Sequence, residues 1–146
     1  MKYLLDTNII IYYLENDQKV YDFVWRYKKD SAISMIAYYE VLNYPFTQEQ
    51  EKLVRAFLEN FEIIGLSHEI INKALQNRKE KKIKMADNFI LATAQVHELQ
   101  LVTNNSKDFE YFIDSVNPLS DDGKIEQIEI AKKPREGWEE KFREGN

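Results

Sequence analysis

The sequence predicts an α/β fold with a short, mostly parallel central sheet. Short apolar runs of strand length alternate along the chain with longer segments that carry apolar residues at helical spacing, as in "YLL" followed by "IIIYYL". Strands that alternate with helices in this way are joined by crossover connections and pair in parallel. The length of 146 residues suits one domain with an appendage.

The first half of the chain predicts two buried strands and four helices. The strands are the apolar run "KYLLD" at 2–6 and "SAIS" at 31–34. The helices follow apolar residues at helical spacing, a capping box of Thr47 and Gln50, and the helix breaker Pro45. We expect them over 9–16 with Thr7 or Asn8 as the cap, over 18–29, over 35–46 with an end or kink at Pro45, and over 47–61.

The second half predicts three more strands and three helices before the composition changes. Strands are expected at 62–66, 100–105 and 113–116, and helices at 67–82, 86–99 and 107–112. The segment "NPLSDDGK" at 117–124 concentrates turn-forming residues, and charged residues predominate beyond it. We therefore place a domain over residues 1–118 and an extension over residues 119–146.

Composition excludes several kinds of site. The chain has no Cys and only two His, which excludes disulfides and thiolate chemistry and argues against a His-rich metal site. The net charge of −5 gives no overall attraction to nucleic acid, so RNA binding would need a local basic patch or metal ions. No apolar run is long enough to cross a bilayer, and the first residues lack a signal-peptide pattern, so we expect a cytoplasmic protein without membrane contact.

Three acidic residues occupy positions where a charged side chain is energetically costly. Asp6 follows the first strand, at the end where open α/β sheets bind ligands. Glu40 shares a predicted apolar helix face with Ile36 and Ala37, and Asp87 opens a helix beside apolar neighbours. A carboxylate on a buried face must be paired, protonated or bound to a metal ion.

Each acid also has a simpler interpretation. Asp6 can act only as a helix cap, and Glu40 can reach past its apolar neighbours to solvent. Asp87 near a helix N-terminus is favoured by the helix dipole, and Lys84 can pair with it. The three together favour a site, because all would face the same end of a parallel sheet.

The pattern of oxygen ligands predicts a divalent cation. Carboxylates without His or Cys suit Mg²⁺ or Mn²⁺, which fits hydrolysis of a phosphodiester bond. Asn105 and Asp108 follow the strand at 100–105, and Thr7 beside Asp6 can orient a ligand or a water molecule.

In this order, "LLDTNIII", "AYYEVL", "MADNFILATA" and "LVTNNSKDF" resemble the PIN-domain ribonucleases, specifically VapC-type toxins of toxin–antitoxin pairs. The resemblance covers residues 1–118 and implies an α/β/α sandwich, Mg²⁺-dependent endoribonuclease activity that leaves 3′-hydroxyl and 5′-phosphate ends, and frequent homodimers. Asp6, Glu40 and Asp87 match the family's first three acids and would be the metal ligands. For the fourth, Asp108 matches one version of the motif, while other members carry Asp where Asn105 stands.

Basic and aromatic residues supply candidate contacts for RNA. The basic run "NRKEKKIK" at 77–84 contains Lys81, Lys82 and Lys84, which we expect to hold the RNA backbone, although a solvated helix end would look the same. Most aromatic residues fall at core spacing. The candidates for base stacking or dimer contacts are Tyr12, Tyr13, Tyr38 and Tyr39.

The segment "KKPREGWEEKF" resembles a second family, the carboxyl-terminal toxin-binding segment of AbrB/MazE-type antitoxins. Trp138 and Phe142 lie four residues apart and would present one apolar face of a helix to a groove. Arg135 would enter a cluster of carboxylates. The chain would then carry its own inhibitory peptide, acting in cis or on a dimer mate; the alternative is an ordinary charged C-terminal helix.

The leading interpretation is a Mg²⁺- or Mn²⁺-dependent ribonuclease toxin with an RNA substrate and an antitoxin or antitoxin-like tail as its partner. The alternative is a catalytically inactive PIN module that acts by binding, which the neutral Asn105 favours. A phosphoacceptor regulator is less well supported, because "LVTNN" supplies no Lys at the end of its strand.

Overall fold

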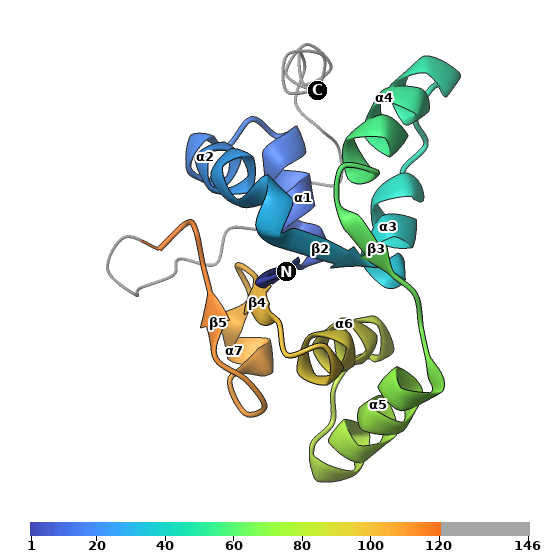
Figure 1. The fold of residues 1–146 in the computed structure, drawn as a ribbon, viewed down its shortest axis with the longest axis vertical. Coiled ribbons are helices and arrows are strands. Elements are labelled where there is room, and N and C mark those ends of the chain that lie inside the picture. The colour runs from blue at the N-terminus through green and yellow to red at the C-terminus, as the bar shows by residue number, and fades with distance from the viewer. Residues whose placement is uncertain (121–146) are drawn as a thin grey trace.

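The computed structural model describes residues 1–120, and these contain one five-stranded sheet in the order β3-β2-β1-β4-β5 (Figure 1). Every neighbouring pair of strands is parallel, which confirms the predicted fold class. The strands are β1 (Tyr3–Leu5), β2 (Ser31–Ser34), β3 (Glu62–Ile64), β4 (Gln100–Val102) and β5 (Ser115–Val116). Residues 119 and 120 are the only described part of the predicted extension, so Arg135, Trp138 and Phe142 lie outside the described residues.

Helices cover both faces of the sheet and form the expected three layers. In Figure 1, α1, α2 and α4 lie on one side of the sheet, and α5 and α6 lie on the other. The helices are α1 (Thr7–Leu14), α2 (Gln18–Tyr27), α3 (Met35–Leu42), α4 (Gln48–Leu58), α5 (His68–Glu80), α6 (Met85–Val96) and α7 (Ser106–Phe109), with a 3-10 turn at Lys28–Asp30. A sheet buried on both faces explains why its strands are continuous apolar runs.

The strand order creates a switch point between β1 and β4. From β1 the chain moves outward through β2 to β3, and it then crosses to the other side of β1 to form β4 and β5. Ligands of open α/β sheets bind outside the carboxyl ends of the strands at such a point. The topology therefore predicts a ligand site among the residues that follow β1 and β4.

The helix boundaries follow from local capping. The predicted capping box is present, with the Thr47 hydroxyl accepting from Gln50 N at 3.2 Å and the Gln50 side chain accepting from Thr47 N at 3.0 Å. α3 ends at Leu42, before Pro45. The prediction that Thr7 or Asn8 caps α1 is wrong, because the N-cap is Asp6, whose Oδ1 accepts from Thr7 N at 2.8 Å. β1 runs into α1 without a turn, so only the residue directly after the strand can take this position.

Helix α1 is buried on nearly all sides, because it packs against the sheet, α2 and α3. Tyr12 and Tyr13 are only 3% and 1% exposed, so the prediction that they stack on bases or face a dimer mate is wrong. The Tyr13 ring stacks on Phe57 of α4 at 4.5 Å and on Tyr21 of α2 at 5.4 Å. Tyr13 thus joins three helices of one layer.

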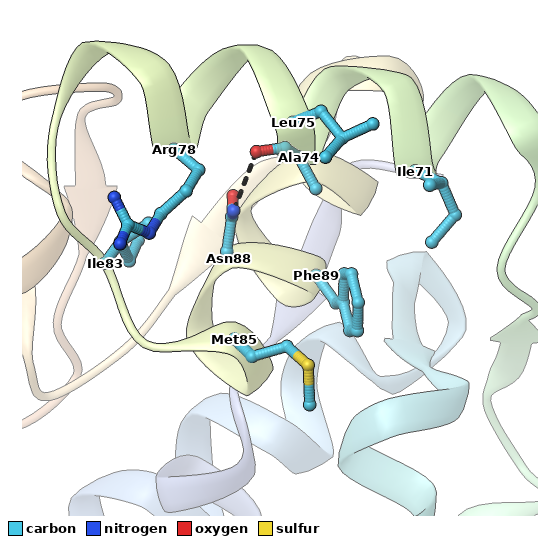
Figure 2. A pocket seen from close by; sticks show the side chains of 8 residues that line it. All are labelled: Ile71, Ala74, Leu75, Arg78, Ile83, Met85, Asn88 and Phe89. Atoms are coloured by element: carbon cyan, nitrogen blue, oxygen red, sulfur yellow. Dashed lines mark hydrogen bonds between the residues drawn. The ribbon is translucent and has the colours of Figure 1, made fainter.

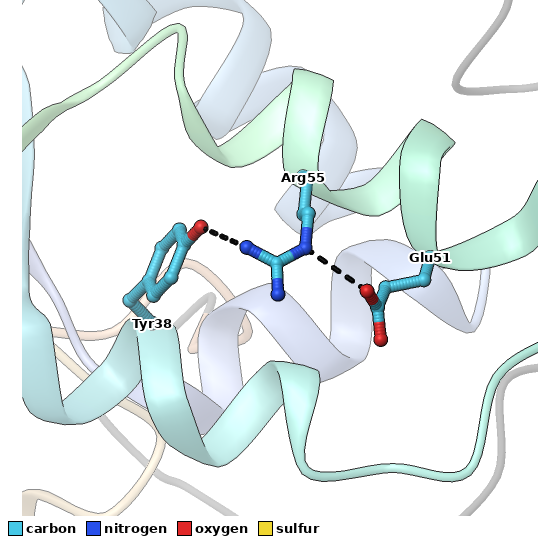
Figure 3. A network of polar contacts seen from close by, with 3 residues as sticks. All are labelled: Tyr38, Glu51 and Arg55. Atoms are coloured by element: carbon cyan, nitrogen blue, oxygen red, sulfur yellow. Dashed lines mark hydrogen bonds and ion pairs between the residues drawn. The ribbon is translucent and has the colours of Figure 1, made fainter. Parts of the chain in front are cut away.

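Helix α3 is tied to α4 by a polar contact at the surface (Figure 3). Arg55 of α4 donates from Nη1 to the hydroxyl of Tyr38 on α3 at 2.8 Å, and its Nε lies 3.0 Å from Glu51 Oε2. Tyr38 precedes Glu40 by two residues, so this contact helps to fix the helix that carries the predicted acid. Within residues 1–120, no helix has the length and apolarity that crossing a membrane requires.

Candidate active site

The sheet register places three polar residues next to one another at its carboxyl edge. Leu5 pairs with Ile33 on one side and with Val102 on the other. The residues that follow these three are Asp6, Ser34 and Thr103, and all three are buried. Asp6 N also donates to Val102 O at 2.9 Å, so the strand pairing continues to the carboxylate itself.

Both carboxylate oxygens of Asp6 accept a hydrogen bond from the protein. Oδ1 accepts from Thr7 N at 2.8 Å, and Oδ2 accepts from the Thr103 hydroxyl at 2.8 Å. Thr103 Oγ1 itself accepts from Asn105 N at 2.9 Å and from Asn8 Nδ2 at 3.4 Å. Because both of these nitrogens donate, the single hydroxyl proton of Thr103 points to Asp6. Thr103 therefore fixes the orientation of the carboxylate, a role that the sequence analysis missed.

Asn104 links this loop to the rest of the fold. Its side chain is 5% exposed, donates to the Tyr12 hydroxyl at 3.0 Å and accepts from Asn117 Nδ2 at 3.1 Å. Asn117 Oδ1 in turn accepts from Leu119 N at 2.9 Å. The loop that holds Asp6 is thus bonded to the segment that leads into the extension. The run of polar residues directly after an apolar strand in "LVTNN" is the sequence signal that could have identified Thr103 and Asn104.

Glu40 reaches the same edge from α3. Its Oε1 accepts from the Thr7 hydroxyl at 2.7 Å, which joins the second predicted acid to the residue after the first. Of the two interpretations of Glu40, the buried position is wrong and the one in which it reaches solvent is confirmed, since the residue is exposed. Its helix carries Ala37 and Val41 toward the core, and the long side chain of Glu40 extends past them to solvent.

Burial and neighbouring charges make the ionised form of Asp6 costly. Together these effects raise the pKa of Asp6 from 3.8 to about 7, and burial is the largest of them. The charges of Asp87 and Glu40 contribute to this rise, while the hydrogen bonds from Thr103 and Thr7 oppose it. The three acids predicted from the sequence therefore act on one another electrostatically at this edge of the sheet.

Asp87 lies in the first turn of α6 and is half-buried. Burial is the largest cause that raises the pKa of Asp87, and the charges of Asp108 and Glu40 raise it as well. The charge of Lys84 lowers it. Asn105 Nδ2 donates to Asp108 Oδ2, so both candidates for the fourth acid lie together. The predicted RNA contacts Lys81, Lys82 and Lys84 are exposed in the segment between α5 and α6.

Buried amides hold α6 against α5. Asn77 Nδ2 donates to Asn88 Oδ1 at 3.1 Å and to Gln95 Oε1 at 2.7 Å, and Asn88 Nδ2 donates to Ala74 O at 2.8 Å. Since Asn88 follows Asp87 in the chain, these bonds fix the helix turn that presents Asp87. Figure 2 shows the pocket of about 350 Å³ beside them, lined by Ile71, Ala74, Leu75, Arg78, Ile83, Met85, Asn88 and Phe89.

The predicted ligands Asp6, Asp87 and Glu40 do not form a preformed metal site. Among residues 1–120, no group of three or more acidic or His side chains is close enough together to hold a metal ion. Mg²⁺ usually binds through one or two carboxylates and keeps several waters, so a preformed cage is not required. The donor chemistry fits a hard divalent cation, because its charge would favour the ionised forms of Asp6 and Asp87, which burial and then the neighbouring charges disfavour.

Comparisons with known proteins agree with this geometry. The PIN domain family model matches residues 3–112. A chain of a toxin–antitoxin complex from Klebsiella pneumoniae is 36% identical, with a TM-score of 0.73 and a match over 80% of this chain and 98% of that one. No curated protein matches the chain.

Two further solved structures have the same fold. A chain of VapBC2 from Rickettsia felis bound to a promoter DNA fragment is 26% identical, with a TM-score of 0.66 and a match over 80% of this chain and 97% of that one. A chain of DNA-bound VapBC from Salmonella typhimurium is 22% identical, with a TM-score of 0.71 and a match over 81% of this chain and 98% of that one. The family match confirms the resemblance of the first domain and ends before the extension. The chain belongs to the PIN-domain family.

Proposed function

We propose that the chain is an endoribonuclease of the toxin–antitoxin type that hydrolyses RNA phosphodiester bonds with Mg²⁺ or Mn²⁺. The observation that carries this proposal is the gathering of acids from four separate segments at the switch point. Besides burial, the charges of Asp87 and Glu40 raise the pKa of Asp6, and those of Asp108 and Glu40 raise the pKa of Asp87. The solved relatives include toxin–antitoxin and VapBC complexes, which supports the same class for this chain.

Asp6 and Asp87 would hold the cation directly, because they are the two acids whose charges are least solvated. Glu40, held in place by the hydroxyl of Thr7, would be the third ligand. Bound there, the cation would lower the pKa of a coordinated water and offset charge on the scissile phosphate. Asn105 and Asp108 would complete the acidic site near Asp87 as one hydrogen-bonded unit.

The chain's own residues would orient the RNA for attack. Thr103 fixes the direction of the Asp6 carboxylate, and Thr7 fixes that of Glu40. The exposed side chains of Lys81, Lys82 and Lys84 would contact phosphates and thereby position the strand without reading its sequence. The products would carry the 3′-hydroxyl and 5′-phosphate ends that the family resemblance implies.

Cleavage of labelled RNA with and without Mg²⁺ or Mn²⁺ tests the proposal. We expect Asp87→Asn to abolish cleavage and Asp114→Asn, an exposed acid before β5, to leave it unchanged. Equal cleavage by Asp87→Asn, or cleavage that persists in excess chelator, would contradict the mechanism.

The alternative function is a catalytically inactive module that binds RNA or protein, and the neutral Asn105 at the fourth position favours it. Titration with Mn²⁺ separates the two. A nuclease should bind the ion through Asp6, so that Asp6→Asn lowers the affinity. An inactive module should show no affinity that depends on Asp6.

The extension is proposed to act as an inhibitory peptide in the manner of an antitoxin. Residues 119–146 contain Arg135, Trp138 and Phe142, and a guanidinium suits a cluster of carboxylates. Tethering would raise the effective concentration of this peptide to about the millimolar range. Truncation after Leu119 should increase RNA cleavage. A truncated chain that is no more active than the full chain would contradict the inhibitory role of the extension.

A homodimer is the proposed assembly. Apolar side chains of α5 and α6 are exposed around the pocket of Figure 2, with Leu75 at 55% and Met85 at 72% exposure. Apolar surface of this kind marks contact sites. Light scattering should give twice the monomer mass for the wild type and the monomer mass for Leu75→Glu; a monomeric wild type would contradict the assembly.

A further inference from the structure

The segments that lead to Asp87 and away from Asp108 lie beside each other, and their far ends meet in a pair of exposed side chains. Lys81 Nζ is 5.3 Å from the centroid of the Tyr111 ring. Lys81 is the C-cap of α5 and precedes Asp87 by six residues, and Tyr111 follows Asp108 by three. Since Asp108 acts electrostatically on Asp87, the two segments are close at both of these points.

Tyr111 lies on an anchored turn, although most of its surface is exposed. The ring is 57% exposed. It packs edge-on against Phe112 at 4.8 Å, and the turn that carries both follows the fully buried Phe109. Phe112 N and Ile113 N both donate to Phe109 O, at 2.9 and 3.0 Å. A flat apolar surface held in this way loses little conformational freedom when a second ring stacks on it.

From this arrangement we propose that Tyr111 is a stacking platform for one unpaired base of the RNA strand, with Lys81 beside it as a phosphate contact. The proposal rests on the proposed ribonuclease function and adds a binding subsite to it. Stacking of a base on an exposed aromatic ring requires a single-stranded substrate, because bases inside a duplex are covered by their neighbours.

The distance to the acids suits a nucleotide that flanks the scissile bond. Three residues span at most about 11 Å of chain, which limits the separation of the Asp108 and Tyr111 backbones. A base on Tyr111 would therefore anchor the strand close to Asp87 and Asp108 without occupying the acidic site. The net charge of −5 makes such a local contact necessary, since the whole molecule repels RNA.

Fluorescence anisotropy with the full chain in excess chelator tests the platform without cleavage. The probe is a fluorescein-labelled single-stranded RNA decamer of uridines, and a second probe set carries one abasic nucleotide at each successive position. Loss of one stacked base costs about 5- to 150-fold in affinity. We expect Tyr111→Ala to weaken binding by about this factor and Tyr111→Phe to retain it. One abasic position should weaken binding to the wild type and not to Tyr111→Ala.

Trp25 offers a matched control. It is 50% exposed, and Lys28 Nζ lies 4.6 Å from its ring centroid, so it reproduces the Lys–aromatic pair. α2 leads into the amino end of β2, on the opposite edge of the sheet from the site. Trp25→Ala should leave binding unchanged, and Lys81→Gln should weaken it and reduce the slope of log affinity against log salt by about one.

The results separate this inference from the nuclease proposal. The platform is overturned if the wild type does not bind the decamer, if Tyr111→Ala binds as tightly as the wild type, or if no abasic position matters. RNA cleavage with Mg²⁺ can persist in each of these cases and would leave the ribonuclease standing. Position-specific binding without cleavage would support the platform and contradict the nuclease.

Discussion

Replacing Asp6 with Asn should stabilise the fold at alkaline pH. The folded protein, chiefly through burial, raises the pKa of Asp6 from 3.8 to about 7, which means that it resists ionisation of this group. At about 1.4 kcal/mol per pKa unit, ionising Asp6 in the folded state costs about 4 kcal/mol more than in the unfolded chain. Asn is close in size and carries no charge, so this cost disappears.

The amide has a cost of its own. Both carboxylate oxygens of Asp6 accept hydrogen bonds, from Thr7 N and Thr103 Oγ1, and an amide can accept only one of them. Leaving one buried donor without an acceptor costs about 1–2 kcal/mol. The net gain of Asp6→Asn at pH 8 is therefore about 2–3 kcal/mol.

The gain in stability of Asp6→Asn depends on pH, and the linkage between proton binding and folding gives its direction. Between about pH 4 and pH 7 the folded protein keeps the Asp6 proton while the unfolded chain has released it, so the stability of the wild type falls as pH rises through this window. Above the folded pKa the loss is complete. Asn does not titrate, so near pH 4 only its lost hydrogen bond remains, and the variant should there be less stable than the wild type by about 1–2 kcal/mol.

Urea unfolding in chelator at pH 4.5 and pH 8 measures the difference, and Asp114→Asn is the control for the loss of an exposed charge. The two stability curves of wild type and Asp6→Asn should cross. Saturating Mg²⁺ should stabilise the wild type and not the variant, by about 2.7 kcal/mol at a hundred times the dissociation constant. A variant that is less stable than the wild type at both pH values would refute the claim that Asp6 is held at an energetic cost.

Two other substitutions test the supporting network. Thr103→Val preserves the side-chain shape but removes the hydroxyl that bonds Asp6 Oδ2 and Asn105 N. The free energy of unfolding should fall by about 2–4 kcal/mol at pH 8. The pH–rate profile of RNA cleavage should move to higher pH, because the pKa of Asp6 rises without this hydrogen bond. Asn77→Ala removes the donor to Asn88 and Gln95. We expect a lower unfolding temperature and a free energy of unfolding that is smaller by about 1–3 kcal/mol. An unchanged unfolding temperature would show that the buried amides do not hold α6 against α5.

The position of Asp6 at a strand end could be predicted because its signal is local. A carboxylate directly after an apolar run marks the end of a strand, and parallel strands end at one edge of the sheet. Asp6 therefore lies where expected, beside the residues that follow β4. The register that sets Asp6 next to Thr103 depends on the pairing of β1 with β4, which are almost one hundred residues apart, and no local pattern carries that information.

The mistaken predictions about burial share a physical cause. Helical spacing shows which residues share a face, but it does not show how many neighbours cover the helix. α1 is covered on several sides and buries Tyr12 and Tyr13, whereas α3 leaves Glu40 at the surface. The sequence did not indicate that Tyr111 is exposed, for the same reason, because its exposure depends on a turn anchored by the buried Phe109.

The repulsion among the carboxylates connects metal binding with inhibition by the extension. Any cation that enters the site relieves the same electrostatic cost, whether it is Mg²⁺ or the guanidinium of Arg135. If the extension reaches the acids, the two must compete, and Arg135→Ala should increase both the apparent affinity for Mn²⁺ and the cleavage rate in the full chain. Calorimetric titration with Mn²⁺ measures the first, and Arg143→Ala is the matched control because it removes an arginine outside the proposed inhibitory motif. Equal Mn²⁺ affinities for the wild type and Arg135→Ala would mean that this guanidinium does not occupy the site, and any inhibition by the extension would then have to act by covering the RNA path.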